Sequence, residues 1–343
     1  EYLEGFAYTC AVLQSAENLE RAACELAQDC LAEGVRYIEV RFAPQLHVRE
    51  SLSLERVVRA VSDGLARAKT EHNASAAVQS GDDIPFEYGL ILCAMRSFNE
   101  DMGPYFAQLL GSLTYTPRKR VFATASLELA RAAARLARDG GLPVVAFDLA
   151  GEEAGYPAID HRDAYQPAHR NFLKKTVHAG EAYGPESIFL AITECHANRI
   201  GHGTFLFAAD MVRDPDIEDP VAYTRLLAET IASLRMTIEV CPTSNLQTTP
   251  EIKSIQEHPV LKMIDYGMSV TICTDNRLVS NTTVSRELEL VADHLPITRH
   301  QFRNLVVAGF KGSFFPGSYR SKRAYVRRVI DRYERLERDL LGE

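Results

Sequence analysis

Short apolar runs alternate with longer amphipathic segments along nearly the whole chain, and this alternation is what most constrains the fold. Most of the short runs are nearly continuous in apolar residues, which is typical of parallel strands buried on both faces. Between them, segments such as 19–31 place apolar residues on one helical stripe. The pattern predicts a parallel sheet with helical crossovers. The predicted strands are residues 37–43, 87–95, 144–149, 175–178, 199–202, 237–241 and 269–274.

The chain has 343 residues, 46% of them hydrophobic, which suits one α/β barrel. An open doubly wound sheet typically carries a glycine-rich turn after its first strand, and neither GxGxxG nor GxxxxGK[ST] occurs. We therefore expect residues 1–343 to form a single (β/α)8 TIM-barrel domain. A closed barrel needs eight strands and seven are predicted, so we expect the first strand to precede Glu1. Residues 126–139 are predicted to be a helix, and 71–85 and 210–220 to be long polar loops.

Composition excludes several classes of partner. The net charge of −8 disfavours nucleic acid, whose binding depends on clustered cations. No run of 18 apolar residues occurs, so no membrane span is expected. The seven cysteines include no CxxC pair, which favours free thiols in a reducing compartment and a cytoplasmic location. In the arginine-rich segment 320–339, acidic residues alternate with the basic ones, which predicts a solvated helix face.

Polar residues stand at the carboxyl ends of the predicted strands, the edge where barrel enzymes hold their catalytic groups. His178 ends one apolar run, and Glu181 follows it across an Ala-Gly turn. His202 lies between two glycines, and Asp275 and Asn276 follow the last run. The remaining strand-end residues are Arg41, Arg96, Asp148 with Gly151, and Cys241 with Pro242.

Each of these residues also has a structural interpretation when it is taken alone. His178 can be a core histidine, His202 a turn residue and Asp275 a helix N-cap. Taken together, their position at the ends of strands of one barrel favours a shared site. Nitrogen and oxygen donors without thiolates suit Zn²⁺ in an open catalytic site. The sequence therefore predicts a metal-assisted hydrolase. Cys241 has no adjacent His or Asp and is interpreted as a barrel-wall thiol.

Six short motifs together resemble the adenosine deaminase family, and they occur in the family's order as far as residues 315–316. The resemblance implies a (β/α)8 barrel with one zinc, which hydrolyses adenosine or 2′-deoxyadenosine to inosine or 2′-deoxyinosine and ammonia. Zinc in such a site acidifies the water that attacks C6 of the purine. The motifs are EVRFAP at 39–44, FDLAG at 147–151, HAGE at 178–181, GHG at 201–203, IEVCP at 238–242 and TDN at 274–276.

The same resemblance implies roles for individual residues. His178 and Asp275 would be zinc ligands, and two further histidine ligands are expected upstream of Glu1, since the family's H-x-H pair does not occur in this chain. Glu181 would hydrogen-bond purine N1 and donate a proton to it, which requires a protonated carboxyl group. His202 would orient the water and help to deprotonate it.

Substrate recognition would involve the backbone of Gly151, the side chain of Glu181, and Asn276. Many relatives have Asp where Asn276 stands, and an amide can donate to purine N7 at any pH. Two alternatives stay open. One is deamination of another 6-aminopurine, such as adenine, a modified adenosine or aminodeoxyfutalosine; AMP is less favoured, although Arg41 and Arg96 stand at strand ends. The other is a catalytically inactive barrel that serves as a binding protein, which the absence of H-x-H supports.

Overall fold

Each predicted apolar run forms a strand in the computed structural model, which describes residues 4–342. All seven strands are parallel and are hydrogen-bonded in chain order. The predictions differ from the observed bounds by one or two residues at the ends. The strands are β1 (Tyr37–Phe42), β2 (Glu87–Met95), β3 (Val144–Ala150), β4 (Lys174–Ala179), β5 (Arg199–His202), β6 (Thr237–Val240) and β7 (Ser269–Ile272).

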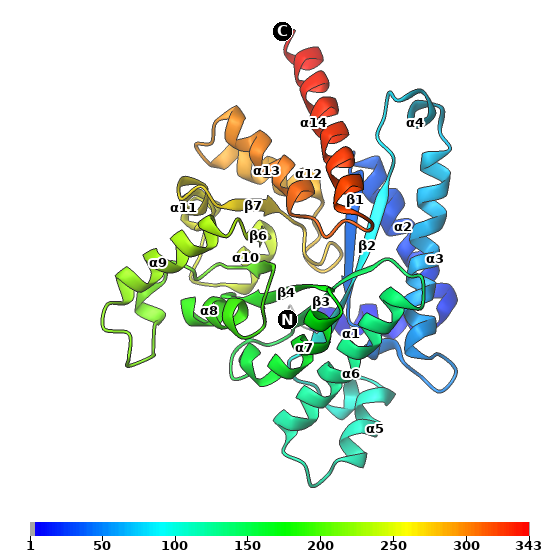
Figure 1. The fold of residues 1–343 in the computed structure, drawn as a ribbon, viewed down its shortest axis with the longest axis vertical. Helices are drawn as coiled ribbons and strands as arrows, with labels where there is room; N and C mark the ends of the chain where they lie inside the picture. Colours follow the sequence, from blue (N-terminus) through cyan, green and yellow to red (C-terminus); the bar gives the residue numbers. More distant parts are fainter. Residues whose placement is uncertain (1–3, 343) are drawn as a thin grey trace.

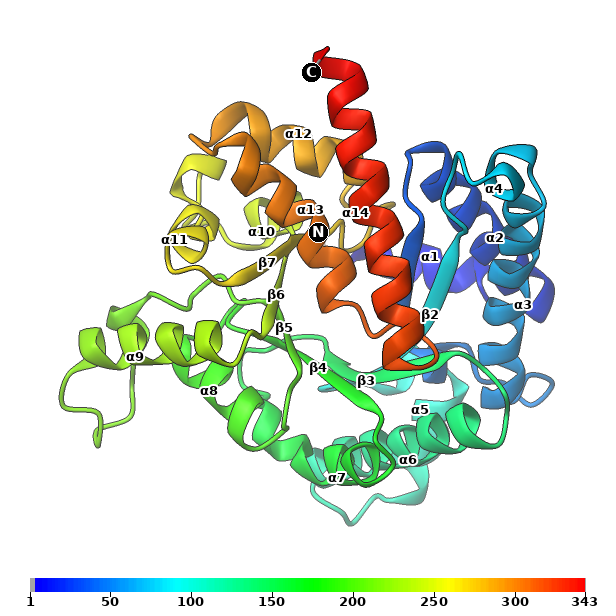
Figure 2. The same ribbon diagram turned by 45° about the horizontal axis from the view of Figure 1, so that its top comes forward.

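The sheet curls around a central axis and helices surround it (Figures 1 and 2). This is the arrangement of a TIM-type α/β barrel, and the predicted fold class is confirmed. The described residues supply seven of the eight strands of such a barrel, with β1 and β7 at the two ends of the sheet. The strand expected before Glu1 lies outside the described residues, as does Glu1 itself.

Helices follow most strands and pack on the outer face of the sheet. The α-helices are α1 (Glu4–Val12), α2 (Ala16–Ala32), α3 (Leu54–Asn73), α4 (Ala76–Ser80), α5 (Pro104–Ser112), α6 (Arg118–Arg138), α7 (Arg162–Arg170), α8 (Pro185–Thr193), α9 (Pro220–Ser233), α10 (Pro242–Thr248), α11 (Val260–Asp265), α12 (Val284–His294), α13 (Arg299–Gly312) and α14 (Tyr319–Leu341). Short 3-10 turns are η1 (Pro44–His47), η2 (Glu100–Met102), η3 (Ala158–His161), η4 (Ala209–Met211) and η5 (Ile255–Glu257). Within residues 4–342, none of the helices combines the length and the apolar character that crossing a membrane requires.

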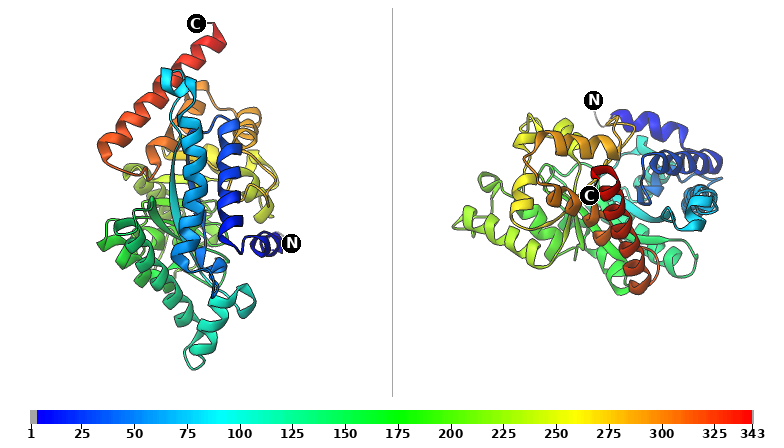
Figure 3. Two further views of the ribbon diagram at one scale, coloured as in Figure 1. Left: turned by 90° about the vertical axis from the view of Figure 1, so that its right-hand side faces the viewer. Right: turned by 90° about the horizontal axis from the view of Figure 1, so that it is seen from above.

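The stripe predicted in 19–31 is the buried face of α2, which begins at its N-cap Ser15 and packs along α3 (Figure 3). The two helices approach closely at Gly64, where an added Cβ would lie 2.0 Å from the backbone oxygen of Glu20. Two predictions need correction. The helix expected at 126–139 begins at Arg118, because Val121 and Phe122 continue its buried face. Residues 71–85 are not one loop, because Ser75 caps the short helix α4.

Charged side chains, rather than apolar ones, fill part of the barrel interior. Arg199 forms ion pairs with Glu39 and Glu239, and Arg41 pairs with Glu239 and with Asp148 at 3.2 Å. Burial alone would raise the pKa of Glu239, but the two arginines outweigh it and lower that pKa to about 2. These five residues, the barrel network, connect the amino-terminal end of the barrel to the end where the predicted site lies.

Helix α14 covers the amino-terminal ends of β1 and β2. The hydroxyl of Tyr325 donates to the backbone oxygens of Arg36 and Pro85, 2.5 and 2.9 Å away. The rest of the helix extends beyond the body of the molecule (Figures 1 and 3). Most of its arginines are exposed, as predicted, and Arg327 pairs with Asp331 one turn later.

Candidate active site

The predicted site residues of three strands meet at the carboxyl edge of the barrel. His178 lies in β4, and His202 ends the neighbouring strand β5, where it pairs in register with Ala179. The two imidazole rings are 5.2 Å apart between centroids. Asp275 follows β7 and lies close enough to His178 to affect its pKa. Glu181 approaches His202 from the turn after β4, with Oε2 3.6 Å from Nε2.

Two of these residues have unusual backbone conformations. The φ angle is +65° at His202 and +53° at Asp275, in the left-handed region that side chains other than glycine seldom occupy. Gly151, just after β3, has a φ of +102°. Strained positions of this kind persist where the surrounding structure fixes them, and they concentrate at functional sites. His202 and Asp275 are two of the six non-glycine residues within 4–342 that have such a φ, so the predicted site includes strained backbone.

Asp148 orients His178. Its Oδ2 atom lies 3.1 Å from Nδ1 of the imidazole, and the carboxyl group is fully buried. Burial opposes the charged forms of both groups, but the pairing with Arg41 and His178 holds the pKa of Asp148 well below its usual value. Burial would lower the pKa of His178, but the carboxylate of Asp148 outweighs it and raises that pKa. With Nδ1 held, Nε2 is the ring nitrogen left for a ligand, as in the carboxylate–histidine pairs of metal sites.

Hydrogen bonds also hold Asp275. Its Oδ2 accepts from Oγ of Ser244 at 2.8 Å, and its Oδ1 accepts from the side-chain amide of Asn276 at 2.9 Å. The helix N-cap interpretation of Asp275 is wrong, because residues 276–280 form turns and the next helix, α12, begins at Val284 with Thr283 as its cap.

His178 and Asp275 fit zinc in the kind of donor they offer. One is an imidazole nitrogen already oriented by a carboxylate, and the other is a carboxylate that follows β7 and affects the pKa of that imidazole. Over residues 4–342, however, no three His, Cys, Asp or Glu side chains are grouped as a metal would require. A catalytic zinc site takes three protein ligands and a water, so these two residues would need at least one further protein ligand. The two histidine ligands expected upstream of Glu1 lie outside the described residues and stay a prediction.

A chain of hydrogen bonds fixes the tautomer of His202. The backbone N–H of Val260 donates to Nδ1 of His258, so the proton of neutral His258 is on Nε2, 3.2 Å from Oδ1 of Asn245. Burial, followed by the nearby His202, lowers the pKa of His258 to about 4 and keeps it neutral. The same Oδ1 also accepts from the backbone N–H of Cys241.

The amide of Asn245 is therefore oriented with its NH₂ group toward His202, and it donates to Nδ1 at 2.9 Å. Neutral His202 then carries its own proton on Nε2, the atom that faces Glu181. Sequence reasoning missed Asn245 and His258, because they belong to no pattern around His202 in the chain. Glu153, which contacts the turn carrying Glu181, was missed for the same reason.

The two strand-end arginines do not extend into the site as free cations. Arg41 is paired within the barrel network. Arg96 is fully buried and donates to the backbone oxygens of Tyr156 and His178. The guanidinium group of Arg41 therefore forms ion pairs within the fold, and that of Arg96 forms hydrogen bonds within it. Cys241 is buried at the end of β6, consistent with a barrel-wall thiol.

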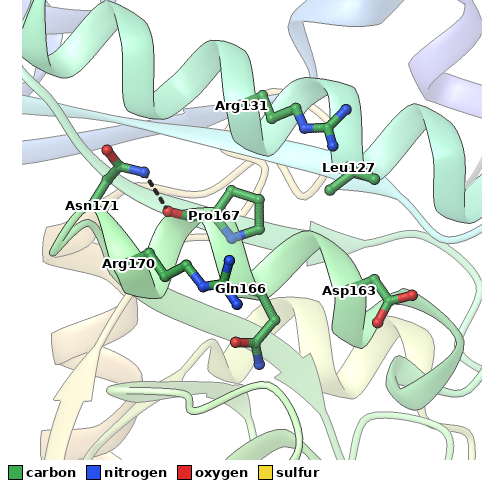
Figure 4. Close-up of a pocket in the computed structure, with 7 residues that line it drawn as sticks. All are labelled: Leu127, Arg131, Asp163, Gln166, Pro167, Arg170 and Asn171. Carbon is green, nitrogen blue, oxygen red and sulfur yellow. Dashed lines mark hydrogen bonds between the residues drawn. The ribbon is translucent and has the colours of Figure 1, made fainter.

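A surface depression lies between helices α6 and α7, away from the strand ends (Figure 4). Leu127 and Arg131 line it from α6, and Asp163 and Arg170 from α7. It contains none of the predicted site residues.

Comparison with known proteins places these observations in a family. A family model described as adenosine deaminase matches residues 1–110 and 113–332. Adenosine deaminase 1 of Streptomyces coelicolor is 36% identical over 315 residues, which cover 92% of this chain and 69% of that protein.

Two solved structures share the fold. The adenine deaminase of Arthrobacter aurescens aligns with a TM-score of 0.70 and 21% identity, over 97% of this chain and 84% of its own. An amidohydrolase from Burkholderia ambifaria with bound zinc aligns with a TM-score of 0.73 and 19% identity, over 96% and 77% of the two chains.

Proposed function

The chain belongs to the adenosine deaminase family of hydrolases, and we propose on this basis that it hydrolyses adenosine and 2′-deoxyadenosine to the corresponding inosine and ammonia with the help of zinc. The observation that carries the proposal is the approach of Glu181 to His202, beside His178 and Asp275, at the edge where barrel enzymes bind substrates. An acid, a second proton-bearing group and two metal-type donors are groups that hydrolysis at C6 of a purine uses, and the metal would need at least one further protein ligand.

His178 and Asp275 would hold the metal. The chemistry that zinc supplies when bound is a water molecule whose pKa is lowered to about 7. The protein contributes the orientation of both donors, through Asp148 for His178 and through Ser244 for Asp275.

Glu181 is the proposed proton donor to purine N1. A proton on N1 makes C6 a better electrophile and lets the ring accept the electrons of the attacked bond. This role requires a protonated carboxyl group on Glu181, whose side chain lies partly buried beside His202.

His202, with its proton on Nε2, presents a donor to the site. We therefore propose that it orients the attacking oxygen through this N–H and stabilises the charge that develops there, and that it does not take the proton of the water as the family resemblance implies. Gly151 would place its backbone against the purine, and Asn276 would donate to the ring from beside Asp275.

A nucleoside suits this site better than a nucleotide. Arg41 and Arg96, the cations at the strand ends, are already paired inside the fold and would have to break those contacts to bind phosphate. The same argument does not separate adenosine from adenine or another 6-aminopurine nucleoside, so these are compared directly in the test.

The test is the fall in absorbance near the adenine maximum when purified, zinc-loaded protein is mixed with adenosine, 2′-deoxyadenosine, adenine or AMP. We expect turnover of the two nucleosides only. Turnover of another purine alone would contradict the proposed substrate, and turnover of none would favour a binding protein. The Glu181→Gln variant should keep its zinc, measured by metal analysis, and lose turnover by about 100-fold or more.

A further inference from the structure

The side chain of Glu153 is buried under the turn that carries Glu181. Glu153 follows β3 in the chain and is only 4% exposed. Its Oε2 atom accepts hydrogen bonds from the backbone N–H groups of Glu181, Ala182 and Tyr183, at 3.0, 2.7 and 2.9 Å. Its Oε1 atom accepts from the N–H of Gly180 at 3.0 Å.

A fifth donor joins these four. The hydroxyl of Ser187, in the first turn of α8, donates to Oε1 of Glu153. Four successive N–H groups thus converge on one carboxylate, and the φ of +70° at Gly180 begins the turn that aims them. Such a concave run of amides is an anion-binding arrangement, and here the anion is a side chain of the protein itself.

Only a carboxylate satisfies this geometry. A glutamine has the same shape, but it offers one acceptor oxygen and an NH₂ group, which would face either three N–H donors or the N–H of Gly180 and the hydroxyl of Ser187. The contacts of Glu153 are therefore specific to its charge and are not a matter of packing alone.

We infer that Glu153 is the residue that positions the proton donor: it fixes the backbone of residues 180–183 and thereby holds the side chain of Glu181 opposite His202. The inference rests on the function proposed above, and it adds a residue that acts on the reaction through Glu181 without touching the substrate. The loops that follow two neighbouring strands, β3 and β4, are joined by it at the site.

The first test measures kcat and KM for adenosine in Glu153→Gln. We expect kcat to fall about 100-fold, the cost of misplacing a catalytic group by about 1 Å, with KM changed less than about threefold. The matched control is Glu152→Gln, which removes the neighbouring exposed carboxylate and should change neither constant. Ser187→Ala removes one of the five hydrogen bonds and should lower kcat about fivefold, and it carries the test if Glu153→Gln does not fold.

A double-mutant cycle separates positioning from a general structural role. If Glu153 acts through Glu181, then Glu153→Gln should lower the residual kcat of Glu181→Gln by less than about twofold. A further drop of about 100-fold in that background would overturn the inference. The same comparison applies to Ser187→Ala.

Hydrogen exchange tests the backbone contact without relying on turnover. The amides of residues 180–183 should exchange faster in Glu153→Gln or Ser187→Ala than in Glu152→Gln, and unchanged exchange would contradict the inference. If the wild-type protein deaminated no purine and yet showed this difference in exchange, the proposed function would be wrong while the anchoring by Glu153 stood.

Discussion

His202 shows how a single residue can be committed to one chemical role by neighbours that never touch the substrate. Asn245 donates to its Nδ1, and His258 fixes the orientation of Asn245. The proton of neutral His202 is thereby placed on Nε2, facing Glu181. The proposed role of His202 follows from this proton.

Replacing Asn245 with Asp tests that role. A carboxylate accepts but cannot donate, so the contact with Nδ1 would survive only with a proton on Nδ1, and a neutral His202 would then have no proton on Nε2. We expect kcat for adenosine to fall about 100-fold, as for the loss of one preorganised donor, with zinc content unchanged. The tautomer can be followed by ¹⁵N NMR of the imidazole.

Asn198→Asp is the control for this substitution. The side-chain oxygen of Asn198 accepts from the backbone N–H of Lys175, which a carboxylate can also do, and the residue is exposed. A wild-type kcat in Asn245→Asp would show that the Nε2 proton is not needed.

At this scale the sequence predicted the residues that end strands and missed those that support them. His178, His202 and Asp275 were found because each follows an apolar run. Glu153 and Asn245 contact their partners across 28 and 43 residues of chain, and no local pattern records such contacts. Supporting residues of this kind become visible only when the strands are placed side by side.

At the scale of elements, the turn between β4 and α8 is the segment on which the site depends most. It carries Glu181, it receives Glu153, and it begins at Gly180 with a φ of +70°. A Cβ added to Gly180 would lie 2.7 Å from Cδ1 of Ile188 in α8. Both the backbone and the space beside it therefore require glycine.

We predict that Gly180→Ala lowers the free energy of unfolding by about 2 to 4 kcal/mol, measured by urea denaturation, because backbone strain and a core clash add together. Gly34→Ala is the matched control. Gly34 has a φ of +88° and no atom within 4 Å of an added Cβ, so it should lose only the strain contribution of about 1 kcal/mol. Equal losses in the two variants would mean that the contact with Ile188 relaxes freely.

Elements were predicted well where the pattern was strong and poorly where it was short. The seven strands were found because each contains a short, mainly apolar run between helical patterns, even though charged residues such as Glu39 and Glu239 interrupt some of them. The five-residue helix α4 was missed because it buries no residue and so leaves no apolar period. The early turns of α6 were missed because residues 118–120 are all arginine or lysine, so the apolar pattern of its buried face begins only at Val121.

Across the whole molecule, the barrel network makes stability depend on acid pH. The pKa of Glu239 is lowered to about 2 in the folded protein, below its value of 4.5 in the unfolded chain. A lowered carboxyl pKa stabilises the fold fully above the unfolded value, and this contribution is lost as the pH falls toward the folded value. We therefore expect the free energy of unfolding to decline between about pH 5 and pH 2.

Urea denaturation at a series of pH values checks this. In Glu239→Gln the decline should be shallower, and stability at pH 7 should fall by about 3 to 5 kcal/mol, since Arg41 and Arg199 keep their charges with fewer partners. Glu229→Gln, which removes the exposed partner of Arg225 on α9, should leave the profile of the wild type unchanged. If the free energy of unfolding of Glu239→Gln declined with falling pH as steeply as that of the wild type, groups other than Glu239 would cause the acid sensitivity.

The contact of α14 with the first strands has a consequence for synthesis. The hydroxyl of Tyr325 bonds the backbone of Arg36, a residue 289 positions earlier, so the ribosome must deliver nearly all the chain before that bond can form. At about 5 to 20 residues per second, the amino-terminal ends of β1 and β2 wait on the order of 15 to 60 s for their cover. During that interval the backbone oxygens of Arg36 and Pro85 are without the hydroxyl of Tyr325, and the cover of these strand ends is among the last contacts that the described chain can make.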